Sequence, residues 1–305
     1  MDQVLPVIVD RDGKYEDGNY ETRNWVIELL RIPAMVVLNL LPARLSKAIF
    51  LAVSGPEGKK VADSVGTFRA METIYAFPWQ RVKGGANIAS RLCDTFLINT
   101  KAVRNRLRLV KRELTDAIQT LLRQKVTVNV LSVGSGSARS VFEVLVLLNG
   151  EVPFNEGPAV NVMLVDIDEE ALRFSEKLAE ILNVNSAIFV KGNFFRLERH
   201  CGEFRPDIVE AVGLLDYLTE KQAVILLKKI WQILAFGGSV ITANIAPNLE
   251  APFVTKGIGW PMVYRTPLQL VDLLVKAGFP AEAIRIKQEP LGIHTMAIAQ
   301  KLIGP

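Results

Sequence analysis

Two glycines at the end of one apolar run and an acidic residue at the end of the next are the clearest chemical signal in this chain. Residues 130–140 have the sequence VLSVGSGSARS, and residues 162–172 have the sequence VMLVDIDEEAL. Gly134 and Gly136 lack a side chain, so they let the backbone approach a ligand closely. Asp166 ends the second run, where a carboxylate can accept hydrogen bonds from the two hydroxyls of a ribose. The two segments therefore predict a nucleoside site.

The spacing of the small residues separates two classes of nucleoside cofactor. The dinucleotide fingerprint GxGxxG needs a third glycine beside a pyrophosphate, and this chain has Arg139 in that place. S-adenosylmethionine has no pyrophosphate, and its usual GxGxG loop needs only a small residue two places after the second glycine, where Ala138 lies. The pattern therefore favours a methyl donor over NAD. The loop also follows a β-branched run, 126–133, and precedes a helical pattern, which is the setting that such a motif requires.

Length and composition limit the remaining possibilities. The chain has 305 residues, of which 50% are hydrophobic and 22% charged, so we expect one catalytic domain with a large core and a smaller helical part. Cys93 and Cys201 are the only cysteines and lie far apart. We therefore expect no disulfide framework, no metal site and a cytoplasmic location.

The apolar segment 25–53 raises the question of a membrane. Charged residues interrupt it, and Pro33 and Pro42 divide it, so the uncharged stretches are too short to span a bilayer. We expect no transmembrane segment. Short buried helices that line an acceptor cavity are one interpretation, and ordinary helical core or a homodimer interface is the other.

A basic cluster lies further along. Helices are expected over 59–77 and 86–123, and the second has one apolar face. Its opposite face carries Lys101, Arg104, Arg106, Arg108, Lys111 and Arg112. With a net charge of +4, this cluster suggests nucleic-acid binding, but we interpret it as a solvated helix face. We expect no nucleic-acid partner, because the chain lacks a DPPY-like tetrapeptide and a Pro-Cys pair, the motifs of base methylation.

Strand and helix patterns alternate from residue 126 onward. Strands are expected near 126–133, 160–166, 186–191, 207–212, 238–244, 283–288 and 293–300. Helices are expected near 138–149, 169–182, 219–235 and 266–278. The alternation predicts an α/β fold with a doubly wound, Rossmann-like, seven-stranded sheet, and a ligand at the carboxyl ends of its strands.

The same segments resemble class I S-adenosylmethionine-dependent methyltransferases. The motifs that carry the resemblance are VLSVGSGSA, LVDIDEEAL, KGNFF, DIVEAVGLLDYL and LLKKIWQILAFGGSVITAN. Three more, AVRNR (102–106), GLLDYLTEKQ (213–222) and GWPMVYRTPLQL (259–270), are similar to a bacterial subgroup linked to the synthesis of 3-hydroxy fatty acid methyl esters. The resemblance implies that residues 126–305 form the S-adenosylmethionine-binding methyltransferase domain. Residues 1–125 would form a helical N-terminal cap over the substrate region.

The motifs and the resemblance together indicate the residues of the cofactor site: Ser132, Gly134, Ser135, Gly136, Ala138, Asp166, Ile167, Asn193, Phe194 and Gly213. Two of these depart from the family. Many members have an acidic residue at the position of Ser132, where it contacts the methionine amino group, and an aspartate at the position of Asn193. A hydroxyl and an amide can still form hydrogen bonds, so we expect cofactor binding. The charge that compensates the sulfonium must then come from elsewhere.

Four side chains are candidates for the acceptor side of the site: Asp216, Tyr217, Arg265 and His294. Asp216 and Tyr217 follow the fourth strand, where they would lie near the transferred methyl group or cap the next helix. Arg265 can hold a substrate carboxylate with its planar fork, or form an internal ion pair. His294 can act as a base, or be a structural residue with satisfied hydrogen bonds.

The leading hypothesis is a methyltransferase that acts on an oxygen of a small hydrophobic acceptor, at a carboxyl or hydroxyl group. The sulfonium is already activated, so transfer mainly requires an acceptor held in line with it, and a carboxylate needs no base at pH 7. Two alternatives stay open. One is a nucleic-acid methyltransferase that uses the basic helix 101–112, and the other is an S-adenosylmethionine-binding protein that transfers no methyl group.

Overall fold

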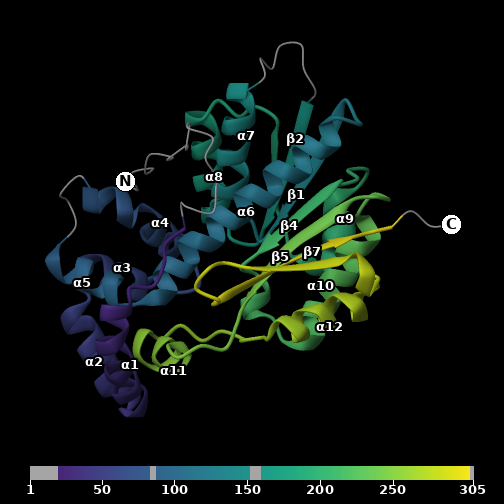
Figure 1. The fold of residues 1–305 in the computed structure, drawn as a ribbon. Coiled ribbons are helices and arrows are strands. Elements are labelled where there is room, and N and C mark those ends of the chain that lie inside the picture. Colours follow the sequence, from purple (N-terminus) through teal and green to yellow (C-terminus); the bar gives the residue numbers. More distant parts are fainter. Residues whose placement is uncertain (1–19, 83–86, 152–158, 303–305) are drawn as a thin grey trace.

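A seven-stranded sheet between two layers of helices forms the centre of the molecule (Figure 1). The computed structural model describes residues 20–82, 87–151 and 159–302. The strand order is β3-β2-β1-β4-β5-β7-β6, with β1 to β5 parallel and β7 antiparallel to both of its neighbours. The predicted α/β, doubly wound class I fold is confirmed.

The strands and helices expected after residue 126 are all present, with ends shifted by at most two residues. The strands are β1 (Thr127–Val133), β2 (Ala159–Asp166), β3 (Ala187–Lys191), β4 (Ile208–Val212), β5 (Ser239–Ile245), β6 (Ile284–Gln288) and β7 (His294–Gln300). The helices are α7 (Arg139–Glu151), α8 (Glu169–Ile181), α9 (Leu197–Cys201), α10 (Glu220–Ile233), α11 (Ala251–Phe253) and α12 (Pro267–Ala277). The short helices α9 and α11 were not expected.

The region before the sheet contains more helices than expected. They are α1 (Trp25–Leu40), α2 (Ala43–Val53), α3 (Gly55–Asp63), α4 (Phe68–Val82), α5 (Ile88–Phe96) and α6 (Ile98–Leu122). The prediction of one helix over 59–77 is wrong because Gly66, with φ of +74°, separates α3 from α4. The prediction of one helix over 86–123 is also wrong. Leu97 is extended between α5 and α6, and the Glu250 carboxylate accepts hydrogen bonds from the first two N–H groups of α6.

The sheet is buried on both faces, which explains its long apolar runs. Along β1, Val128 and Val130 pack in the cluster that α6, α7 and α8 supply. Leu131 and Val133 pack in the other cluster, with α9, α10 and α12. Helix α6 therefore belongs to the core of the sheet, although it precedes the first strand in the chain.

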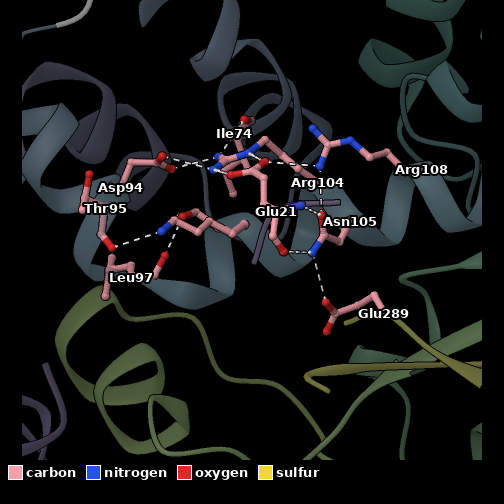
Figure 2. A network of polar contacts seen from close by, with 11 residues as sticks. Glu21, Ile74, Asp94, Thr95, Leu97, Arg104, Asn105, Arg108 and Glu289 are labelled. Atoms are coloured by element: carbon pink, nitrogen blue, oxygen red, sulfur yellow. Dashed lines mark hydrogen bonds and ion pairs between the residues drawn. The ribbon is translucent and has the colours of Figure 1, made fainter. Parts of the chain in front are cut away.

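The basic face of α6 is not solvated, so that interpretation is wrong. Arg104, Arg106 and Lys111 are 4%, 5% and 6% exposed, and the other three basic residues are half-buried. Figure 2 shows Glu21 lying between Arg104 and Arg108, with Asp94 on the other side of Arg104. Buried cations of this kind are tolerated because carboxylates pair with them. The cluster consequently offers no open basic surface to a nucleic acid.

The N-terminal helices α1 and α2 contribute no residue to the cavity at the carboxyl ends of the strands, contrary to one of the two interpretations of segment 25–53. Pro33 lies inside α1, and only Pro42 divides the segment. An apolar face of α1 is open, with Trp25 74% and Leu40 81% exposed. A homodimer interface on this face stays a prediction, which sedimentation of the full chain tests. No helix among the described residues is both long and apolar enough to cross a membrane.

We expect a fragment of residues 126–305 not to fold on its own. Leu109, Leu114 and Ile118 of α6 are buried in the same cluster as β1, so their removal exposes a large apolar surface of the sheet. Circular dichroism and thermal unfolding of the fragment, beside the full chain, measure this. A soluble fragment with a cooperative transition near that of the full chain would contradict it.

Candidate functional site

A cavity of about 410 Å³ lies at the carboxyl ends of β1, β2 and β4, where the strand order reverses between β1 and β4. The ends of the strands form one wall, and α3, α4, α6 and the π-helix Val254–Ile258 form the other. Helical and sheet parts of the chain thus share one cavity. The apolar part of the lining consists of Val61, Phe68, Met71, Ile74, Val103, Leu107, Trp260 and Met262, with others.

Most of the predicted site residues line this cavity. They are Gly134, Ser135, Gly136, Asp166, Ile167, Asn193, Phe194, Gly213, Asp216, Tyr217 and His294. Ser132, Ala138 and Arg265 do not line it. Ala138 packs in the core with φ of +51°, so its part is to shape the loop rather than to contact a ligand.

The glycine loop and the end of β2 lie side by side at the edge of the cavity. Gly134 and Gly136 have φ of +64° and +54°, the region that favours glycine. The Asp166 carboxylate accepts hydrogen bonds from the N–H groups of Gly136, at 2.7 Å, and Asp168, at 2.9 Å, and lies at the cavity edge. The Ser135 hydroxyl is buried without a partner. A carboxylate and an unpaired hydroxyl beside open backbone fit the ribose and carboxylate ends of S-adenosylmethionine.

Asn193 and Phe194, which follow β3, also line the cavity. The side-chain oxygen of Asn193 accepts a hydrogen bond from the N–H of Phe195 at 2.9 Å and so begins the 3-10 helix Phe194–Arg196. The replacement of an aspartate by Asn193 therefore preserves the local turn. Phe194 places its ring beside the cavity, where it can pack against an adenine.

Ser132 is buried below the cavity, so its predicted role as a cofactor contact is wrong. Its hydroxyl donates a 2.5 Å hydrogen bond to Glu210, the residue beside it on β4. Glu210 does line the cavity, and burial raises the pKa of its carboxyl to about 7. An acid is thus present near the usual position, but it comes from the neighbouring strand. A charged residue inside the apolar run DIVEAV was the signal that could have revealed it.

Arg265 is not available to a substrate, and its predicted role as a carboxylate fork is wrong. Its guanidinium donates hydrogen bonds to the carbonyl oxygens of Leu215, at 2.8 Å, and Leu218, at 2.6 Å, and to Asn244. The alternative of an ion pair is not found among the described residues either. Arg265 instead fixes the backbone of the 3-10 helix Leu215–Tyr217, which carries two of the other candidates.

Asp216 is buried at the floor of the cavity. One of its oxygens accepts hydrogen bonds from Asn244, at 3.0 Å, and from the N–H of Ile245, at 2.8 Å. Its other oxygen lies 3.4 Å from Arg106. Burial raises the pKa of Asp216 to about 6. The next residue, Tyr217, accepts a 2.8 Å hydrogen bond from the Trp260 indole, and burial raises the pKa of its hydroxyl to about 12.

His294 begins β7 and is 3% exposed, yet neither of its ring nitrogens has a hydrogen-bond partner. Burial, and to a smaller extent the charge of Arg106, lowers the pKa of His294 well below its usual value. The ring is therefore neutral at pH 7 and has one N–H to donate. The interpretation of His294 as a structural residue with satisfied hydrogen bonds is wrong.

Arg106, like Glu210, is a cavity residue that sequence reasoning missed. It was assigned to the basic helix face, but it lines the cavity from α6. A Cβ atom placed on Gly213 would lie 3.5 Å from its guanidinium nitrogens, so the guanidinium packs on the backbone just after β4. The signal was its place inside the AVRNR motif. The cavity therefore contains a buried cation on the wall that α6 forms.

Comparisons with known proteins agree with this geometry. The family described as "Putative methyltransferase" matches residues 27–301. The chain belongs to this family. No curated protein matches the chain.

Several solved structures share the fold of this methyltransferase. A possible exported protein from Bordetella parapertussis aligns with a TM-score of 0.56 and 16% identity, over 86% of this chain and 98% of that one. The S-adenosylmethionine-dependent methyltransferase SibL in its apo form aligns with a TM-score of 0.52 and 15% identity, over 82% and 71%. Identities this low show the fold alone. The family confirms the prediction of a methyltransferase, and the shared fold agrees with it.

Replacing Asp166 by alanine should weaken S-adenosylmethionine binding to this methyltransferase by about 1 to 3 kcal/mol, since charge-assisted hydrogen bonds to the ribose are lost. Isothermal titration calorimetry measures the change, and thermal unfolding checks that the variant is folded. Asp272→Ala, on the exposed side of α12, is the matched control and should bind as the wild type does. Equal affinity of a folded Asp166→Ala variant would refute the ribose assignment.

Proposed function

We propose that the protein transfers the methyl group of S-adenosylmethionine to an oxygen of a small hydrophobic acceptor, at a carboxyl or hydroxyl group. The observation that carries the proposal is the single cavity, because it joins the glycine loop to apolar walls from the N-terminal helices. A largely apolar wall with a few polar groups is typical of small-molecule sites. The resemblance to the fatty acid methyl ester subgroup supports the same acceptor class.

We assign residues 126–305 to the donor-binding domain and residues 1–125 to a helical cap over the acceptor, of which the last helix, α6, also completes the core of the sheet. Val61, Phe68 and Ile74 supply the cap side of the cavity, and Trp260 and Met262 extend it from the loops after β5. Residues 1–19 of the cap lie outside the described residues. Both cysteines are free, which supports the cytoplasmic location that we propose. Retention of the enzyme with a cytoplasmic marker on cell fractionation tests the location.

Different residues of the donor site would bind different parts of the cofactor. Asp166 would bind the ribose hydroxyls, and Phe194 and Asn193 would flank the adenine. Glu210 would bind the methionine ammonium and supply the negative charge that Ser132 lacks. S-adenosylmethionine, when bound, supplies a methyl group that is already activated on a sulfonium. The chain's own task is to orient the acceptor and exclude water.

Product analysis tests the function directly. The full chain is incubated with S-adenosylmethionine and a panel of hydrophobic carboxylic acids, alcohols, phenols and amines, and with RNA and DNA. We expect S-adenosylhomocysteine to form together with an O-methylated small molecule. Cofactor binding without S-adenosylhomocysteine would show a protein that transfers no methyl group, and products confined to nitrogen or nucleic acid would contradict the acceptor class.

The Glu210 assignment predicts a dependence on pH. With a pKa of about 7, Glu210 is mostly ionised at pH 8 and mostly protonated at pH 6. Glu210→Gln keeps the hydrogen bond with Ser132 but removes the charge, so it should weaken S-adenosylmethionine binding about tenfold at pH 8 and little at pH 6. Calorimetry at both pH values measures this.

A matched ligand separates the charge effect from general damage to the site. 5′-Methylthioadenosine has no ammonium group, so its affinity should be the same for the wild type and Glu210→Gln. A raised pKa means that ionisation of Glu210 destabilises the folded state as the pH rises from about 4.5 to about 7. The variant should therefore be no less stable than the wild type at pH 8. An unchanged S-adenosylmethionine affinity at pH 8 would rule out the ammonium contact.

A further inference from the structure

We propose that Arg106 and His294 together bind the two oxygens of an acceptor carboxylate, so that the enzyme selects hydrophobic carboxylic acids over alcohols and amines. This inference rests on the proposed function and specifies its substrate class. It differs from the expectation that Arg265 holds the acceptor, because Arg265 is occupied by backbone carbonyls outside the cavity.

Arg106 is under-paired compared with a neighbour on the same helix. Arg104, which does not line the cavity, has two carboxylate partners, Glu21 and Asp94, with contacts from 2.6 to 3.1 Å. In the described part of the chain, Arg106 has one carboxylate within ion-pair distance, Asp216 at 3.4 Å, and its charge also lowers the pKa of Glu210. Its other contacts are the Met71 sulfur, at 3.5 Å, and the Tyr75 hydroxyl, which are neutral. A buried guanidinium of this kind retains donors for an anionic ligand.

His294 supplies an independent indication of a ligand. It lines the same cavity and is buried, and neither ring nitrogen has a partner in the described part of the chain. Burying an unpaired polar group destabilises a fold, so such a group is expected where a ligand pairs with it. Asp216, which contacts Arg106 at 3.4 Å, also accepts a hydrogen bond from the N–H of Ile245, and Ile245 is paired with His294 on the neighbouring strand. The two side chains therefore share one region of the cavity.

This region lies where the methyl group is transferred. The Arg106 guanidinium packs on Gly213, the first residue after β4, and Asp216 follows at the cavity floor. A carboxylate held there between a planar fork and an imidazole N–H has one oxygen free to attack. The new bond forms between that oxygen and the methyl carbon, while the carbon–sulfur bond breaks and its electron pair stays on sulfur. No proton has to leave.

The same groups disfavour other acceptors. A protonated amine would be repelled by Arg106 and would lose its hydration. An alcohol must give up a proton, but the ring of His294 is a poor base, since its pKa lies well below the usual value. Asp216 already accepts two hydrogen bonds on one oxygen and contacts Arg106 with the other. A carboxylate needs no base at pH 7.

Binding of matched ten-carbon probes to the full chain tests the inference. Decanoate, decan-1-ol and decylamine are each titrated by calorimetry into protein saturated with S-adenosylhomocysteine, and each is also assayed as an acceptor. We expect decanoate to bind at least tenfold more tightly than the other two and to be the probe that is methylated. Arg106→Gln and Arg106→Lys should each weaken decanoate binding about 30-fold or more, because neither side chain reproduces the charged fork.

His294→Phe is the second variant, and it separates ligand binding from folding. It fills the same space and removes the unpaired nitrogens, so its melting temperature should equal or exceed that of the wild type. Decanoate binding should nevertheless fall about tenfold. His200→Asn alters the other histidine, which does not line the cavity, and should leave decanoate binding unchanged. Affinity for S-adenosylmethionine should stay within twofold in the two histidine variants. In the Arg106 variants the matched ligand is 5′-methylthioadenosine, whose affinity should stay within twofold, because the charge of Arg106 also lowers the pKa of Glu210.

Distinct results separate failure of this inference from failure of the proposed function. Equal or better binding and methylation of decan-1-ol would overturn the carboxylate inference and leave O-methylation intact. Full decanoate binding by folded Arg106→Gln and His294→Phe variants would overturn the two-residue anchor. A wild-type chain that binds S-adenosylmethionine but produces no S-adenosylhomocysteine with any acceptor would overturn the proposed function itself.

Discussion

The fold depends on the pairing of the buried cations of α6. Arg104 and Lys111 are removed from water, and each is paired with carboxylates from elsewhere in the chain: Glu21, Asp94 and Glu143. Loss of one partner from such a buried pair typically costs about 3–5 kcal/mol, because an uncompensated charge stays behind. The segment before α1, helix α5 and helix α7 are therefore tied to α6, which itself completes the core of the sheet.

Arg106 lies in the same helix but serves a different purpose. Its ion-pair contact, Asp216, is positioned by Asn244 and the Ile245 backbone, on β5. Arg265 in turn fixes the turn that carries Asp216. The two arginines therefore have different roles. Arg104, which has two carboxylate partners, is structural, and Arg106, which has weaker pairing, faces the cavity. Pairing, rather than residue type, distinguishes a site residue from a scaffold residue here.

Features that depend on neighbouring residues in the chain could be predicted from the sequence, whereas features that depend on distant residues could not. Strands buried on both faces and the glycine loop depend on neighbours in the chain, so the fold and residues such as Gly134 and Asp166 could be predicted. Glu210, which we propose in place of the missing acid, lies beside Ser132 on the adjacent strand, and strand register is not visible from one segment. The burial of the basic face of α6 likewise depends on partners tens of residues away. Arg106 was overlooked for that reason.

Burial of the titratable groups of the cavity lowers the free energy of unfolding. Burial raises the pKa of Glu210 and Asp216, so their ionisation works against folding as the pH rises toward 7. Burial lowers the pKa of His294, so the contribution of this residue to the free energy of unfolding decreases as the pH falls below about 6.5. The two contributions therefore oppose each other between about pH 4.5 and 6.5. At neutral pH, an ammonium beside Glu210 and a carboxylate beside Arg106 and His294 would supply the missing partners. With the ligand contacts that we propose, the groups that cost folding energy are also the ones that recognise charge, so ligand binding would stabilise the fold at this site.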